Sequence, residues 1–274
     1  MLMHRTFWYL ETHRHKDVIL VAIAADLAVS PAYLTRASVT ALDLPLMANL
    51  RARRLTEAAI QLAQGQGSVL TAVLDTGYAA PEPFARAFRA ELGPTPSEVR
   101  TRGSVAELPL TLPKEIDMSQ APRLAPPYVE AMPERRILGP MRRYTMATRG
   151  GIPGQWAAYN MDGIQSPGAV PERWYGVCAN VGVDGDFDYL CGMEVPHGPV
   201  PDAWAALILP AGGWARFCEA GHISNMNSVW GEIFGHWMGR EGLIPRDGPV
   251  AEFYPLSFNG QTGEGGFEIW MPVA

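Results

Sequence analysis

The sequence predicts two domains: an all-α domain with two helix-turn-helix units, followed by an α+β domain. Capped amphipathic helical segments fill residues 1–103, and strand-like apolar runs separated by turn signals fill residues 127–274. Between them, residues 104–126 contain Pro109, Pro113 and Pro122 without apolar periodicity, which is typical of an interdomain linker. The chain of 274 residues is long enough for both domains to bury a core.

The first helix-turn-helix unit is predicted from its turn. A short aromatic helix over 7–15 leads into an almost wholly apolar helix over 18–27. Ser30 and Pro31 then form an N-cap and first-turn pair, so a second helix begins at this point. Two helices joined by a tight turn of this kind make a helix-turn-helix candidate.

A long helix over 45–64 links this unit to a second one, in which Ser68 caps a helix over 69–74. The stretch 77–100 completes the second unit. Gly77 suits the turn, and Phe84, Phe88 and Leu92 fall on one helical face, while Arg86 lies off it. Gly93 and the prolines after it end that helix.

The same stretch resembles the signature of AraC/XylS-family transcription regulators, whose pattern is matched by Gly77-Tyr78, Phe84-Ala85-Arg86-Ala87-Phe88, Gly93-Pro94-Thr95-Pro96 and Arg100. The register extends back through the first unit with three departures: Ser38 replaces a usual Phe, Asp43 a usual Gly, and Asn49 a usual aromatic residue. The resemblance implies a DNA-binding regulator that works with RNA polymerase on double-stranded promoter DNA.

In such units, the exposed face of the second helix contacts bases in the major groove, and arginines and helix ends contact phosphates. Glu82 could instead favour a helix start, and Arg89 could pair with nearby acids. The predicted DNA-binding residues are Ala32, Tyr33, Thr35, Arg36, Glu82, Arg86 and Arg89.

Charge and composition bear on whether the protein binds DNA, spans a membrane, is secreted or holds a metal. The net charge is −6, but it is +2 up to Ser104 and −8 beyond it. The total charge therefore does not exclude DNA binding by the first domain, and the acidic second half is a poor nucleic-acid surface. No apolar run is long enough to cross a bilayer, and residues 1–16 lack the apolar run and small-residue cleavage site expected of a secretory signal. Three scattered cysteines form no metal pair. We expect a cytoplasmic, nucleoid-associated protein without metal or cofactor.

The second domain repeats one order of elements, strand, helix, strand, strand. This predicts a duplicated α+β unit with two helices on an antiparallel sheet. The predicted strands are 129–132, 136–144, 174–183, 189–195, 205–210, 214–219, 250–257 and 266–273, and the predicted helices are 154–164 and 222–239.

This half resembles the GyrI-like family of small-molecule-binding domains. The matching pieces are Gln155-Trp156, Tyr175-Gly176, the run 189–195, Gly221-His222, Glu252-Phe253-Tyr254 and the run 269–272. The resemblance implies that a small-molecule effector binds here and that Glu252 is its carboxylate partner.

The residues support that chemistry independently, because seven of the eight tryptophans lie in this half. Aromatic rings with one carboxylate can hold a lipophilic cation by area, cation–π attraction and charge. An outward-facing Glu252 on an edge strand is the alternative. The predicted ligand-binding residues are Glu252, Trp156, Tyr175, Trp214, Trp230, Phe234 and Trp270.

Three functions follow from these patterns. The first is a transcription regulator whose second domain binds a lipophilic, aromatic or cationic effector that modulates promoter binding. The second, which the resemblance to the GyrI-like family implies, is a hydrolase of strained-ring genotoxic compounds, with Glu252 as a general acid or base. The third is a protein-interaction module. The sequence contains no Ser-His-Asp set and no phosphate loop, so the enzymatic alternative depends on Glu252 alone.

Overall fold

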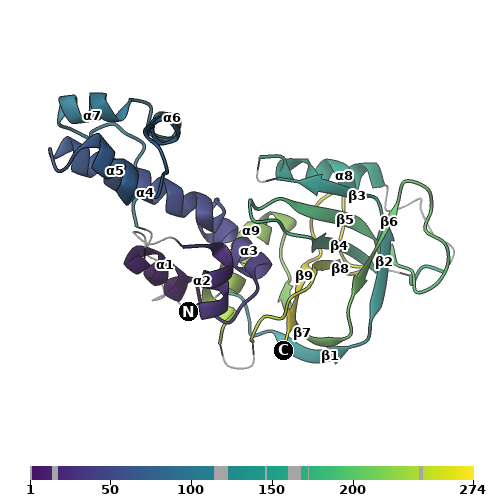
Figure 1. The fold of residues 1–274 in the computed structure, drawn as a ribbon. Helices are drawn as coiled ribbons and strands as arrows, with labels where there is room; N and C mark the ends of the chain where they lie inside the picture. Colours follow the sequence, from purple (N-terminus) through teal and green to yellow (C-terminus); the bar gives the residue numbers. More distant parts are fainter. Residues whose placement is uncertain are drawn as a thin grey trace.

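The computed structural model describes residues 2–13, 18–113, 123–145, 147–159, 168–171, 173–240 and 243–274. A helical half and a sheet half follow one another, as the sequence predicts, and the long helix α4 runs away from the sheet toward α5, α6 and α7 (Figure 1). The helical half consists of α1 (Leu2–His13), α2 (Leu20–Asp26), α3 (Pro31–Leu42), α4 (Leu46–Ala63), α5 (Val69–Asp75), α6 (Pro81–Leu92) and α7 (Pro96–Arg102).

Side-chain caps begin the helices at the predicted positions. The backbone N–H of Tyr33 donates to Ser30 Oγ at 3.1 Å, with Pro31 in the first turn of α3. Ser68 and Thr71 form a reciprocal capping box at the start of α5. Each cap satisfies a backbone N–H that has no partner within the helix. The two N-caps predicted from sequence are therefore confirmed.

Two departures from the AraC/XylS pattern, Ser38 within α3 and Asp43 at its end, are accommodated locally. Ser38 is fully buried, and its hydroxyl donates to the carbonyl oxygen of Thr35 at 2.9 Å, so no polar group is left unpaired. Asp43 ends α3 in the left-handed region with φ 57°. At the equivalent position, α6 ends with a glycine, Gly93, whose φ is 94°. A non-glycine residue there costs roughly 1–2 kcal/mol. The first unit is thus the less regular of the two.

In the described part of the second half, nine strands form one antiparallel sheet in the order β1-β7-β9-β8-β4-β5-β2-β6, with β3 also pairing with β5. The predicted strand over 136–144 is two strands, because Pro140 interrupts it. The strands are β1 (Tyr128–Met132), β2 (Arg135–Gly139), β3 (Met141–Tyr144), β4 (Trp174–Ala179), β5 (Phe187–Glu194), β6 (Ala205–Leu209), β7 (Gly212–Glu219), β8 (Val250–Tyr254) and β9 (Phe267–Val273).

The predicted duplication is visible in the element order. The segment β3-α8-β4-β5 is followed by β7-α9-β8-β9, and β4 pairs with β8 where the two repeats meet. Helix α8 (Ile152–Tyr159) follows the short turn η1 (Arg149–Gly151), and residues 160–164 of the predicted helix lie outside the described residues. The second helix is divided into η2 (Ile223–Asn225), α9 (Met226–Glu232) and the π-helical turn η3 (Ile233–Trp237).

The two helix-turn-helix units differ in where their buried residues pack. Leu34 and Ala37 of α3 belong to one apolar cluster with Phe234 of η3 and Phe217 of β7. The second unit has a separate core around Phe84 and Phe88. The first unit is therefore packed as part of the sheet half, while the second unit stands apart at the far end of α4 (Figure 1).

Arg53 fastens α4 to two other segments. Its Nε and Nη2 donate to the two carboxylate oxygens of Glu11, both at 2.9 Å, and its Nη1 donates to the carbonyl of Thr111 at 2.8 Å. The Arg53 side chain is only 7% exposed. Thr111 also donates its N–H to Thr56 Oγ1 at 3.0 Å, so the beginning of the expected linker lies along α4.

Among the described residues, no single helix is long and apolar enough to cross a membrane. Helices α2 and α3 reach the necessary length and apolar content only when taken together, and a bend of 96° separates them. Their apolar residues contribute to the core just described.

We predict that Arg53→Met lowers the free energy of unfolding by about 2–3 kcal/mol, because Glu11 loses a partner for a largely buried ion pair. Urea unfolding followed by circular dichroism measures this. Arg51→Met is the control, since Arg51 is exposed on the same helix and its replacement should change stability by less than about 0.5 kcal/mol. Equal stabilities of the two variants would contradict the prediction.

Candidate functional site

A cavity of about 1380 Å³ lies between α3 and the sheet half. Its lining comes from α3 on one side and from α8, β4, β8, α9 and the loop 256–261 on the others. This volume exceeds the roughly 300–1,000 Å³ of common small-molecule sites. The cavity is therefore large enough for a drug-sized organic ligand.

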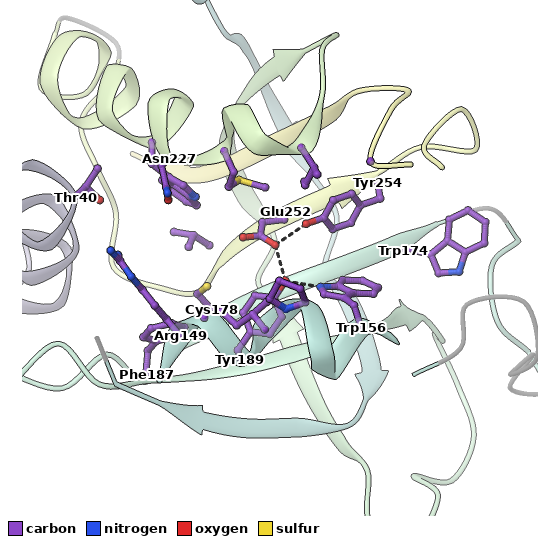
Figure 2. Close-up of a pocket in the computed structure, with 18 of the residues that line it drawn as sticks. Thr40, Arg149, Trp156, Trp174, Cys178, Phe187, Tyr189, Asn227, Glu252 and Tyr254 are labelled. Carbon is purple, nitrogen blue, oxygen red and sulfur yellow. Dashed lines mark hydrogen bonds between the residues drawn. The ribbon is translucent and has the colours of Figure 1, made fainter. Parts of the chain in front are cut away.

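Glu252 projects into this cavity from β8, where strand alternation puts Val250, Glu252 and Tyr254 on the cavity face. Glu252 is 9% exposed. Its Oε2 accepts hydrogen bonds from the hydroxyls of Tyr189, at 2.5 Å, and Tyr254, at 2.8 Å (Figure 2). Trp156 Nε1 donates in turn to Tyr189 Oη at 2.8 Å. The carboxyl group thus stands at the centre of a hydrogen-bonded aromatic cluster.

Gly176 makes room for this cluster. It is paired with Glu252 across the β4–β8 ladder, and a Cβ at this position would overlap Tyr189 Oη and lie 2.5 Å from Glu252 Oε2. Any larger residue would therefore displace the tyrosine or the carboxyl group. This explains why a glycine stands within an otherwise side-chain-rich central strand.

Burial raises the pKa of the Glu252 carboxyl above its ordinary value, while the hydrogen bonds from Tyr189 and Tyr254 partly oppose that rise. Burial, and then the charge of Glu252, also raise the pKa of both tyrosines, which therefore remain hydroxyl donors. The Cys178 thiol nearby has a raised pKa for the same two reasons. Within the described residues, no arginine, lysine or histidine forms an ion pair with Glu252.

Aromatic rings cover much of the remaining surface. Trp230 stacks on Phe234 with ring centroids 5.6 Å apart, and Trp156 meets Tyr254 edge-on at 5.2 Å. Both pairs line the cavity, as do Trp174 and other rings that the sequence did not single out. A flat, apolar ligand could stack on these rings while a charged atom approaches Glu252.

Comparison with known proteins agrees with this geometry. Residues 125–274 match the GyrI-like small molecule binding domain, and residues 23–102 match a helix-turn-helix domain. The chain belongs to the GyrI-like family. Its N-terminal part is a helix-turn-helix domain of the AraC type. Both resemblances seen in the sequence are thereby confirmed.

The relatives cover only parts of the chain. The transcriptional regulator BrlR of Pseudomonas aeruginosa is 34% identical over 105 residues, which is 38% of each protein. The regulatory protein SoxS of Salmonella typhimurium is 30% identical over 94 residues, or 34% of this chain and 88% of SoxS. A putative transcription regulation protein from Staphylococcus aureus, solved by crystallography, is 16% identical, with TM-score 0.42 over 54% of this chain and 97% of its own.

Four of the seven predicted ligand-binding residues line the cavity of the GyrI-like domain: Glu252, Trp156, Trp230 and Phe234. Their contact with a ligand stays a prediction. Tyr189, Tyr254 and Gly176, which complete the carboxylate cluster, were not singled out as site residues. The signal for them was present, because all three stand within the segments that resemble the family.

The other three predicted residues, Tyr175, Trp214 and Trp270, do not line this cavity, and their contact with a ligand also stays a prediction. They belong to a buried apolar cluster on the opposite face of the sheet. Side chains alternate along a strand, so Tyr175 faces away from the side that Gly176 and Cys178 share. Tyr175 Oη instead donates to Glu194 at 3.1 Å. These residues were selected because they are aromatic. The face of the sheet on which each lies depends instead on whether its position along the strand is odd or even.

The predicted DNA-binding residues lie in two different environments. Glu82, Arg86 and Arg89 are exposed on α6. On α3, Tyr33 is 4% and Thr35 1% exposed, Ala32 is half-buried, and Arg36 Nη2 donates to the carbonyl of Gly248 in the GyrI-like domain at 3.0 Å. The first set is available to a duplex in this conformation, whereas the buried members of the second set are not.

We predict a distinct pH dependence for the ligand-free protein. Because the pKa of Glu252 is raised on folding, its contribution to stability is full below the ordinary carboxyl value of about 4.3 and falls as the pH rises through the raised value. Urea unfolding followed by tryptophan fluorescence, at a series of pH values, should show the wild type losing stability relative to Glu252→Gln over that interval. Parallel profiles for the two proteins would contradict the raised pKa.

Proposed function

We propose that this protein is a DNA-binding transcription regulator whose GyrI-like domain binds a small lipophilic aromatic cation and thereby modulates promoter binding. The observation that carries the effector class is the Glu252 carboxyl, buried among aromatic rings and bonded to two tyrosine hydroxyls. A buried carboxylate without a cationic partner is costly. A ligand cation supplies that partner, and its rings fill the apolar surface.

The DNA-binding part of the proposal rests on the second unit. Its recognition helix α6 presents Arg86 and Arg89 to solvent on the face opposite Phe84 and Phe88. Such a helix can lie in a major groove, with arginines on base edges or phosphates. The names of the relatives BrlR and SoxS, both regulators, agree with this role. Contact with RNA polymerase is part of the same proposal.

One observation favours the hydrolase as a second candidate. A carboxyl group with a raised pKa is suited to general acid catalysis near neutral pH. Incubating the protein with a lipophilic cation and with a strained-ring electrophile, and analysing both by mass spectrometry, separates the candidates. Unchanged recovery of both compounds supports binding alone, and turnover lost in Glu252→Gln supports the enzyme.

We predict that Glu252→Gln weakens binding of tetraphenylphosphonium at least tenfold, about 1.4 kcal/mol, because the amide keeps the shape but loses the charge. Tryptophan quenching measures the affinity. Triphenylphosphine oxide, a neutral aromatic compound of similar size, should change less than twofold. Glu264→Gln, an exposed carboxylate removed in the same way, is the matched control. Equal losses for the cation and the neutral compound would contradict charge recognition.

We also predict that Arg86→Ala weakens binding to a duplex selected by the wild-type protein from a random library by about 1–3 kcal/mol. Arg36→Ala should cost less, because Arg36 is held by Gly248 rather than exposed. Fluorescence anisotropy at fixed salt concentration measures both affinities. The reverse ranking would show that the first unit anchors the protein on DNA.

A further inference from the structure

The two recognition helices, α3 and α6, begin in the same way, but their equivalent residues lie in different surroundings. Helix α3 begins at Pro31 and α6 at Pro81, so equivalent positions lie 50 residues apart. Arg36 corresponds to Arg86 and Val39 to Arg89. The two positions on α6 are exposed, whereas the two on α3 line the cavity. The face that α6 offers to solvent is the face that α3 turns toward Glu252.

Specific contacts hold α3 in this position. Arg36 Nη2 donates to Gly248 O at 3.0 Å, and the Tyr33 ring meets Phe234 edge-on at 5.4 Å. At the end of α3, Arg149 of the GyrI-like domain forms a 3.1 Å ion pair with Asp43. In Figure 2, Thr40 and Arg149 mark the α3 side of the cavity, across from Glu252.

The docked position leaves two polar atoms of α3 unsatisfied. Tyr33 Oη and Arg36 Nε are buried without a hydrogen-bond partner in the described part of the chain. Buried polar groups are usually paired. Six other side-chain atoms in the described chain are also buried without a partner, so the two on α3 support a second position of this helix only together with the contacts above. They are accounted for if the docked position is one of two states of α3 and these groups are solvated or paired in the other.

We propose that the effector cavity and the DNA-reading face of the first unit are the same surface of α3, so that a ligand in the cavity holds α3 on the GyrI-like domain and opposes DNA binding by the first unit. This rests on the proposed function in taking the occupant to be the lipophilic cation. The cavity is then a composite site, completed by Thr35, Arg36, Val39 and Thr40 of the DNA-binding domain.

The antagonism follows from linkage. A ligand that touches both walls binds the docked form more tightly than a form in which α3 has left, and it shifts the equilibrium toward docking by that difference. A recognition helix in a major groove buries the same face against base edges. Ligand and first-unit DNA contact therefore exclude each other, and each must weaken the other by the same factor. The second unit is unaffected, because its core is separate.

The first test uses the wild-type chain and two duplexes. One is the duplex selected for binding by the wild-type protein, and in the other the half-site of the first unit is scrambled. The two half-sites are told apart by footprinting, because the Arg86→Ala variant should lose protection only at the half-site of the second unit. Saturating tetraphenylphosphonium should lower affinity for the complete duplex at least fivefold and for the scrambled duplex less than twofold. The complete duplex should weaken tetraphenylphosphonium binding by the same factor. Unchanged or increased affinity for the complete duplex, or equal effects on both duplexes, would overturn the proposal.

The second test needs no ligand. Phe234→Ala removes the ring that packs on Tyr33 and should raise the affinity of the ligand-free protein for the complete duplex at least fivefold. Phe253→Ala is the matched control, because Phe253 packs in the cluster on the opposite face of the sheet, and its affinity should stay within twofold. If Phe234→Ala does not fold, Arg149→Ala, which breaks the ion pair to Asp43, should give a two- to threefold gain.

These arms separate two failures. If tetraphenylphosphonium causes no tryptophan quenching, the proposed effector class is wrong, and the ligand-free variants still decide whether docking opposes DNA binding. If tetraphenylphosphonium binds but the docking variants gain no DNA affinity, the effector class stands and the shared surface of α3 is wrong.

Discussion

The burial of the Glu252 carboxyl is the constraint on which the rest of the site depends. A carboxyl group surrounded by tryptophan and phenylalanine is unfavourable unless hydrogen-bond donors face it, and Tyr189 and Tyr254 supply them. Those hydroxyls can reach it only because Gly176 leaves space in the central strand. In the proposed function, a ligand cation meets the remaining electrostatic deficit. One buried carboxyl group thus accounts for residues on three strands and, in the proposed function, for the chemical class of the ligand.

The position of α3 gives the two helix-turn-helix units different roles. The core of the second unit is its own, so α6 is presented on a body that the ligand does not touch. The first unit shares its core with the GyrI-like domain and contributes a wall of the cavity. In the proposed coupling, no signal has to pass through the linker, since a ligand in the cavity would contact the first recognition helix directly. The linker lies along α4 at Thr111, which fixes where the chain leaves the second unit.

Much of this arrangement could be predicted from the sequence, because local rules decide it. The caps at Ser30 and Ser68, the helix end at Gly93 and the repeated order of strands and helices all follow from short-range chemistry. The sequence was a weaker guide to the face of the sheet on which a strand residue places its side chain. Tyr175 and Gly176 are neighbours, and a shift of one residue separates the side of the sheet with the buried apolar cluster from the cavity side. The docking of α3 was beyond reach, because it joins residues such as Arg36 and Gly248 that are far apart in the sequence.

A cavity wall that belongs to another domain also changes what selectivity means. In a rigid pocket, a ligand that is too large is excluded by overlap with the walls. If α3 undocks as proposed, a large ligand could still pair with Glu252 while failing to contact Val39 and Thr40. Such a ligand would gain binding energy without stabilising the docked form, and it would not oppose DNA binding. Affinity is then set mainly by the carboxylate and the rings of the GyrI-like domain, whereas the response is set by the fit against α3. Under the proposed docking of α3, two ligands of equal affinity can therefore differ in how strongly they oppose DNA binding by the first unit.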